Sequence, residues 1–148
     1  MRRAGVTVAL AGALAAMLAG CGGGGRLSHS DFVRRADAVC SAYQAKIDLL
    51  TQPASYDDVI AYVEKTLPLY VAALDELRAL DAPAADEAGV KTWLAANRKV
   101  EAAVRSLRDA AMRHDPAATN DASAAIQAAS LASRRAAATL GLKVCSTP

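Results

Sequence analysis

The sequence predicts an all-α fold, a four-helix up-down-up-down bundle closed by a disulfide to the C-terminal tail. Four segments of about 23 to 30 residues repeat apolar residues at the spacing of a helix, and none alternates with the period of a strand. Short connections separate the four segments. The composition agrees, because the chain is 53% hydrophobic but only 4% aromatic. Much of the apolar content is alanine, which favours helices that approach one another closely.

The first helix is expected to begin at Ser28 and to end at Gln52-Pro53. Ser28 is an N-cap residue, and Asp31 completes a capping box with it. Apolar residues then recur over about six turns, at Phe32, Ala36, Val39, Cys40, Tyr43, Ile47 and Leu50. The apolar face of this helix therefore includes a cysteine.

A second capping box, Ser55 and Asp58, opens the next helix. Pro68 lies inside its apolar pattern, where a proline removes a backbone hydrogen bond and clashes with the carbonyl four residues back. The pattern keeps one phase across Pro68, through Val59, Val63, Leu67, Tyr70, Leu74 and Leu77. We therefore expect one bent helix rather than two.

Two further helices follow a break at Asp81-Ala82-Pro83. Pro83 is expected in the first turn of the third helix, where its missing N–H costs nothing, and His114 is expected at the end of that helix. Asp115 and Pro116 fit the N-cap and first position of the fourth helix, and Gly141 fits the left-handed residue that ends it.

The first 21 residues read as an export signal. Arg2 and Arg3 precede an apolar stretch over residues 4–19, which is shorter than the ~20 residues that span a bilayer comfortably. The stretch closes as Leu-Ala-Gly-Cys at 18–21, which resembles the lipobox of bacterial lipoproteins. The resemblance implies that Cys21 becomes the first mature residue and carries a diacylglyceryl group. The alternative is an unmodified cysteine behind an ordinary signal peptide.

These features divide the chain into three parts. Residues 1–20 are expected to be a removed signal peptide, residues 21–27 a lipidated cysteine with a glycine-rich tether, and residues 28–148 the bundle. Membrane lipid would then hold the protein through Cys21, on the extracytoplasmic face of the cell membrane. Arg2 and Arg3 supply the net charge of +2, so the mature chain is balanced and offers no electrostatic basis for binding nucleic acid.

The two remaining cysteines, Cys40 and Cys145, form an even pair in an oxidising compartment. In the predicted bundle the fourth helix ends beside the start of the first. Cys40 lies roughly 18 Å along the first helix, and the tail after Gly141 spans roughly 16 Å when extended. The sequence therefore predicts a Cys40–Cys145 disulfide; the alternative is a buried free thiol and a mobile tail.

The mature chain is also similar to small alanine-rich helical envelope lipoproteins of actinobacteria. The similarity rests on Asp37-Ala38-Val39-Cys40 in the first helix and on the closing Gly-Leu-Lys-Val-Cys of residues 141–145. This resemblance implies a helical fold and an envelope location, and it implies no activity.

No catalytic or metal-binding pattern is present in the sequence. His29 and His114, the two histidines, lack the Glu-x-x-His spacing of a metal site in a bundle. Adjacent carboxylates at 57–58, 75–76 and 86–87 point about 100° apart on a helix, so they form no acid–base couple. We expect no enzyme activity, no metal and no cofactor.

One polar residue, Asn97, interrupts the apolar face of the third helix, one turn after Trp93. A buried amide needs hydrogen-bond partners, and the hydroxyl of Tyr43, Tyr62 or Tyr70 would serve. Asn97 is either a boundary position that touches water or an interior group that fixes the helix register or orients a ligand.

Two functions fit these observations. The first is a non-catalytic interaction or scaffold module for an envelope protein partner, which requires a filled core and an exposed patch. The alternative is a binder of a small apolar ligand in the bundle interior, which requires a cavity between the helices. Its candidate lining residues are Trp93, Asn97, Tyr43 and Tyr70.

Overall fold

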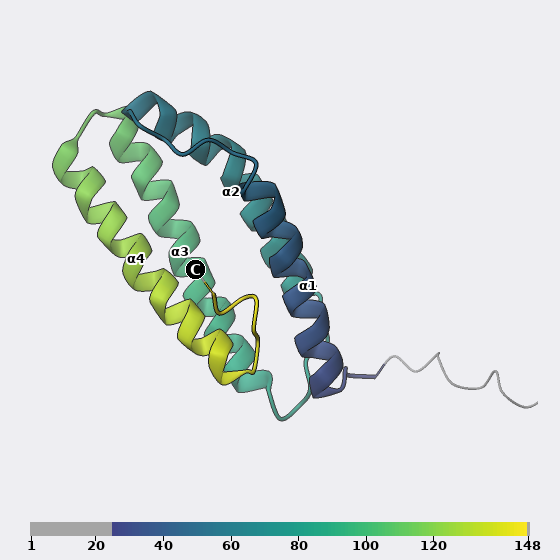
Figure 1. Cartoon of the computed structure of the whole chain (residues 1–148). Coiled ribbons are helices and arrows are strands. Elements are labelled where there is room, and N and C mark those ends of the chain that lie inside the picture. Colours follow the sequence, from purple (N-terminus) through teal and green to yellow (C-terminus); the bar gives the residue numbers. More distant parts are fainter. Residues whose placement is uncertain (1–24, 148) are drawn as a thin grey trace, which may run out of the picture.

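The computed structural model describes residues 25–147, which fold as four helices joined by short connections (Figure 1). The helices are α1 (His29–Ile47), α2 (Tyr56–Arg78), α3 (Glu87–Met112) and α4 (Pro116–Thr139). No strand occurs within this range, so the predicted all-α bundle is confirmed. The predicted signal peptide and Cys21 lie outside the described residues. None of the four helices is long and apolar enough to span a membrane.

The two predicted capping boxes form at the starts of α1 and α2. Ser28 Oγ accepts a hydrogen bond from the Asp31 backbone N–H over 3.1 Å, and Ser55 Oγ accepts one from the Asp58 N–H over 3.2 Å. Each hydroxyl also donates to the acidic side chain, over 2.8 Å in both cases. These hydroxyl bonds are the largest cause that lowers the pKa of Asp31 and of Asp58.

The helix ends around α4 also follow the prediction. Asp115 accepts a hydrogen bond from the Ala118 N–H over 3.0 Å, and Pro116 is the first residue of the helix. Gly141 has a φ of 75°, and the Leu142 N–H donates to the Ala137 carbonyl over 3.0 Å. This Schellman motif turns the chain back and directs Leu142 into the core.

Two predicted helix boundaries are wrong. α1 ends at Ile47, before Gln52-Pro53, and the connection that follows runs on alongside the start of α2 (Figure 1). α3 begins at Glu87, because the Pro83 carbonyl accepts from the Asp86 N–H over 3.0 Å and closes a turn ahead of the helix. Pro83 therefore precedes the helix instead of starting it.

Pro68 does not divide α2, which continues as one helix from Tyr56 to Arg78. Pro68 itself is exposed, while the neighbouring Thr66 and Leu67 are buried. The proline ring therefore faces solvent, while the buried apolar residues before and after it face the core.

The largest side chains of the core gather at the end of the bundle where α1 begins and α4 ends. Phe32, Leu74, Trp93 and Leu142 are each no more than 2% exposed, and they come from α1, α2, α3 and the tail. Full burial of such a side chain contributes roughly 1.5–3 kcal/mol. In the other half of the bundle α3 and α4 bury only alanines, Ala103, Ala110, Ala111 and Ala122, and α2 adds Val63 and Leu67.

The helices do not pack evenly around this core. α3 lies along α4 over most of its length, α2 packs on α3, and α1 packs on α2. The backbones of α1 and α4 do not approach each other closely, although Phe32 and Ala36 of α1 share the buried core with Ala137 of α4. Instead, the tail from Gly141 to Thr147 folds back between these two helices (Figure 1). The tail therefore fills the space between α1 and α4 and closes this side of the bundle.

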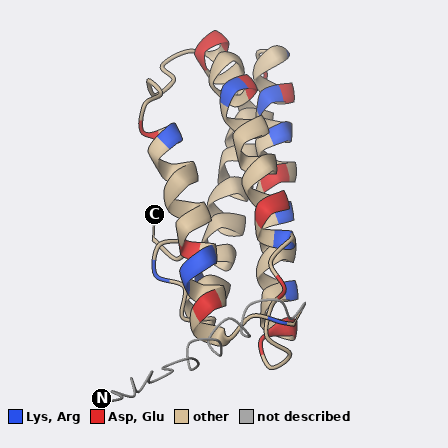
Figure 2. Ribbon diagram, turned by 90° about the vertical axis from the view of Figure 1, so that its right-hand side faces the viewer, with Lys and Arg blue, Asp and Glu red and all other residues tan. Residues whose placement is uncertain are grey.

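Acidic and basic residues are interspersed along the bundle (Figure 2). Several ion pairs join neighbours on a single helix, such as Arg105 with Glu101 over 2.8 Å and Arg78 with Asp75 over 2.6 Å. Exposed pairs of this kind contribute little to stability.

Candidate functional site

The Cys40–Cys145 disulfide anchors the tail to α1. The S–S distance is 2.03 Å, the two Cα atoms are 5.4 Å apart, and the bridge joins residues 105 positions apart in the sequence. The predicted pairing is confirmed.

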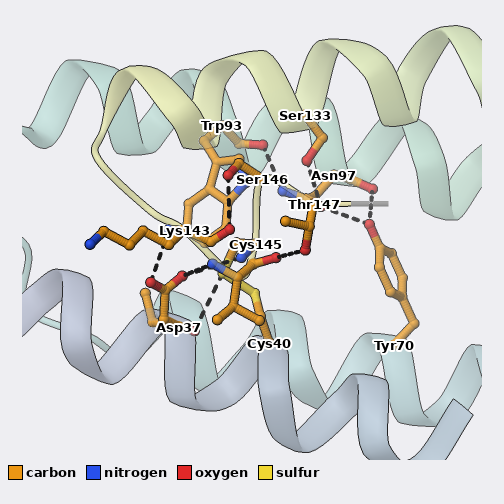
Figure 3. Close-up of a disulfide and its surroundings, with 12 residues drawn as sticks. Asp37, Cys40, Tyr70, Trp93, Asn97, Ser133, Lys143, Cys145, Ser146 and Thr147 are labelled. Carbon is orange, nitrogen blue, oxygen red and sulfur yellow. Dashed lines mark hydrogen bonds between the residues drawn. A yellow bond between two sulfur atoms is a disulfide. The ribbon is translucent and has the colours of Figure 1, made fainter. Parts of the chain in front are cut away.

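One carboxylate beside the bridge, that of Asp37, holds the tail by three further contacts (Figure 3). Its Oδ2 accepts from the Lys143 backbone N–H over 2.9 Å, and its Oδ1 accepts from the N–H groups of Val144 and Cys145 over 2.9 and 3.2 Å. We call these three contacts the Asp37 clamp. The clamp satisfies backbone donors that have no helix or sheet partner, and the sequence analysis did not predict it.

A cavity of about 280 Å³ lies beside the disulfide, between the helices and the tail. All four helices contribute to its wall, and the disulfide and the tail residues Val144 and Thr147 complete it. Its main polar and aromatic lining residues are Tyr43, Tyr70, Asn97, Ser130, Ser133 and Arg134. Gln44 and Thr147 at its rim are exposed, so the cavity opens to solvent there.

Three of the four predicted lining residues, Tyr43, Tyr70 and Asn97, lie at this cavity. Trp93 does not, which corrects the prediction: it is 2% exposed and packs with Phe32 and Leu142 in the core. The Trp93 Nε1–H is buried without a hydrogen-bond partner among residues 25–147, so packing, and not polar contact, holds the indole.

Asn97 is the hub of a hydrogen-bond network at the cavity wall (Figure 3). Asn97 is 8% exposed, and its Nδ2 donates to the Trp93 carbonyl over 3.0 Å. Its Oδ1 lies 2.8 Å from the Tyr70 hydroxyl and 3.0 Å from the Ser133 hydroxyl. Asn97 is thus an interior polar group, and Tyr70 is its tyrosine partner.

The direction of each bond in this network is fixed. A backbone carbonyl only accepts, so the Asn97 amide must turn its NH₂ group toward Trp93 and its oxygen toward Tyr70 and Ser133. Both hydroxyls must then donate to that oxygen. The lone pairs of Tyr70 Oη and Ser133 Oγ stay available, so at this point the cavity wall accepts hydrogen bonds.

The two tyrosines pack edge to face, with ring centroids 5.6 Å apart and an interplanar angle of 61°. Burial raises the pKa of Tyr43 to about 12, with a smaller contribution from Tyr62. Burial also raises the pKa of Tyr70, and Tyr43 and Glu101 add to the effect. Both rings therefore stay neutral at physiological pH and form an apolar wall with hydroxyl tips.

Arg134 is the one charged side chain among the described lining residues. It is half-buried, and it forms no hydrogen bond or ion pair with any of residues 25–147. Arg134 could not be predicted from the sequence, because the alanine-rich pattern of α4 does not show which of its faces points inward.

A second hollow of about 450 Å³ lies between α3 and α4 near the opposite end of the bundle. Its charged lining residues, Asp109, Arg113 and Asp121, are all exposed. It holds no buried polar group that would fix the orientation of a ligand, so the smaller cavity is the better candidate site.

The two histidines lie away from the cavity. His29 Nδ1 is 2.7 Å from an Asp86 oxygen and joins the start of α1 to the start of α3. The ring of His114 packs edge to face on Tyr56 with a centroid distance of 5.2 Å. In the part of the chain that the structure describes, no cluster of three or more His, Cys, Asp or Glu residues is placed to hold a metal ion.

A comparison with known protein families, curated proteins and solved structures finds no match for this chain. Its function is therefore inferred from the site.

Proposed function

We propose that this protein is an exported lipoprotein whose helical domain binds a small molecule in the cavity beside the disulfide. Acyl chains on Cys21 would hold it on the extracytoplasmic face of the cell membrane. The lipobox-like residues 18–21 support the anchor, and the Cys40–Cys145 disulfide supports an oxidising compartment.

The start of the described chain is compatible with such a tether. The Leu27 N–H donates to the Asp81 carbonyl over 2.8 Å, and Arg26 pairs with Glu87 over 2.8 Å. These contacts fix the segment that follows the glycine run to the connection between α2 and α3. None of the residues that make these contacts lines the cavity, so the attachment does not block it.

The cavity is the observation that favours ligand binding over a scaffold role. A scaffold module needs a filled interior and a continuous exposed patch. Here a cavity of about 280 Å³ opens between the four helices and the tail, just below the ~300–1,000 Å³ typical of ligand pockets. The large exposed apolar residues sit on separate elements, at Leu49, Met112, Leu131 and Val144. The space suits a small compound.

Filling the cavity tests this function. Ser130 is half-buried, lines the cavity and forms no side-chain hydrogen bond with the described residues, so Ser130→Phe should place a ring in the space. Gln127→Phe, on an exposed position of the same helix, is the matched control.

Native mass spectrometry of the exported protein should detect a bound small molecule in the parent chain and in the Gln127→Phe control. Ser130→Phe should abolish it. A protein that carries no small molecule but co-purifies with an envelope protein through both variants would overturn ligand binding and favour the scaffold role.

The anchor has a separate test. Cys21→Ser removes the thiol that would be acylated and should move the protein from the membrane fraction to the soluble extracytoplasmic fraction. Cys40→Ser is the control, because it removes a cysteine of the folded domain, together with its disulfide to Cys145, and should leave the anchor in place. Retention of the Cys21→Ser chain in membranes would refute lipidation.

A further inference from the structure

We infer that the ligand is a small organic anion with an apolar body and a hydrogen-bond donor, a description that fits a hydroxylated aromatic acid. This inference rests on the proposed small-molecule binding and specifies its chemistry. Three parts of the cavity wall, each with a different preference, support it.

The first part is the acceptor pair. Tyr70 Oη and Ser133 Oγ each donate their one hydrogen to Asn97 Oδ1, over 2.8 and 3.0 Å (Figure 3). What they offer to the cavity is lone pairs, so they select a ligand that brings an O–H or N–H group. A ligand with only an acceptor there would either face two lone pairs or have to break the network, and both outcomes weaken binding.

The second part is Arg134. Its lining neighbours in the described structure include no Asp, Glu or Lys. Glu101, whose charge adds to the raised pKa of Tyr70, does not line the cavity and pairs with Arg105 over 2.8 Å. A half-buried guanidinium whose donors are not engaged by the protein is the usual recognition group for a carboxylate. Arg134, Ser133 and Tyr70 all line the cavity, so the charge and the acceptor pair can bind different groups of one small molecule.

The third part is the apolar surface between these groups. The edge-packed rings of Tyr43 and Tyr70 form one side, and Val100, Val144 and the disulfide add to it. A volume of about 280 Å³ equals that of about nine water molecules at ~30 Å³ each. One aromatic ring with short substituents occupies such a space.

Four related compounds test this assignment on the full chain in mild detergent. The probes are para-hydroxyphenylacetate, its methyl ester, para-methoxyphenylacetate and para-cresol, with affinity measured by ligand-observed NMR titration. The ester lacks the anion, the methoxy acid lacks the donor, and para-cresol lacks the acid arm. We expect para-hydroxyphenylacetate to bind tightest, by about tenfold or more over each of the other three, which is the loss expected for one charge-assisted or buried hydrogen bond.

Arg134→Gln should reduce the acid-over-ester preference to near unity while para-cresol binding changes less than twofold. Arg135→Gln is the matched control, because Arg135 is exposed and does not line the cavity. Equal affinity for the acid, the ester and para-cresol, all abolished by Ser130→Phe, would overturn the anionic-ligand inference and leave cavity binding intact. Binding of none of the four, or binding that survives Ser130→Phe, would overturn the proposed function as well.

Discussion

Removal of the Asp37 carboxylate should destabilise the fold, although Asp37 lies outside the main core. Asp37→Ala deletes all three hydrogen bonds from the backbone N–H groups of Lys143, Val144 and Cys145. Hydrogen bonds to charged groups contribute roughly 1.5–3 kcal/mol each when protected. The carboxylate is only half-buried and the freed N–H groups can reach water, so about 1 kcal/mol each is appropriate. The expected loss is about 3 kcal/mol in the free energy of unfolding, or roughly 10 °C in Tm.

Urea denaturation of the disulfide-intact protein, followed by far-ultraviolet circular dichroism, measures this loss. Asp48→Ala is the control, because within residues 25–147 the exposed Asp48 carboxylate accepts a side-chain bond only from Gln44, and it should cost less than about 0.5 kcal/mol. A cost below about 0.5 kcal/mol for Asp37→Ala as well would mean that the clamp does not stabilise the fold.

A double-mutant cycle with the disulfide tests how the clamp acts. In a chain with Cys40→Ser and Cys145→Ser the tail can detach, and the cost of Asp37→Ala should then fall below about 1 kcal/mol, because the clamp has already lost much of its effect. Equal costs with and without the bridge would show that the clamp and the disulfide stabilise different parts of the protein.

Three further predictions follow from the same structure. Replacement of both Cys40 and Cys145 by serine should lower the unfolding free energy by about 4–5 kcal/mol, as the chain-entropy relation gives for a bridge across 105 residues; guanidinium denaturation showing under 1 kcal/mol would contradict this. Burial raises the pKa of Tyr43 to about 12 and also raises that of Tyr70. The two neutral tyrosines should therefore contribute fully to the stability of the fold below about pH 10, the ordinary pKa of tyrosine. This contribution should be lost as the pH rises toward 12. Phenolate absorbance that grows in for both rings near pH 10 would contradict it. The pKa of Asp58 is lowered by its N-cap hydroxyl, so its contribution should be present above about pH 4 and lost as the pH falls through the depressed value. Asp58→Asn should therefore flatten the acid side of the stability curve, and an unchanged curve would refute this.

The features that were correctly predicted are local in the sequence. Ser28 and Ser55 each sit three residues before the acid that completes the box, and Pro116 follows its own N-cap directly. Gly141 needs only its neighbours to identify it as a left-handed cap. The disulfide was predictable at long range because only two cysteines remain beyond Cys21 and the bundle topology brings them together.

The Asp37 clamp was not predicted, because its partners are backbone N–H groups more than one hundred residues further on, and every residue except proline has such a group. The spacing of Asp37 and Cys40 in the sequence could nevertheless have indicated this contact. Asp37 lies three residues before Cys40, and residues at this spacing share a helix face. A tail that reaches Cys40 from the start of α1 therefore passes the carboxylate of Asp37.

The helix boundaries and the cavity contain two further features that could not be predicted from the sequence. Pro83 was expected to start a helix, but a proline fits the turn before a helix as well as its first position, and only the Asp86–Pro83 hydrogen bond distinguishes the two. Asn97 was located because a polar residue stands out on an apolar stripe. Arg134 was not, because among so many alanines no stripe defines the inner face of α4.

The bridge between α1 and the tail has a mechanical consequence. A pull applied between an N-terminal attachment and the far end of the chain runs through the first turns of α1, across the two sulfur atoms and out along the tail. The loop that the Cys40–Cys145 disulfide closes contains α2, α3 and α4, and it does not carry this force. A pull can therefore extend only the residues outside this loop, until a reductant opens the disulfide.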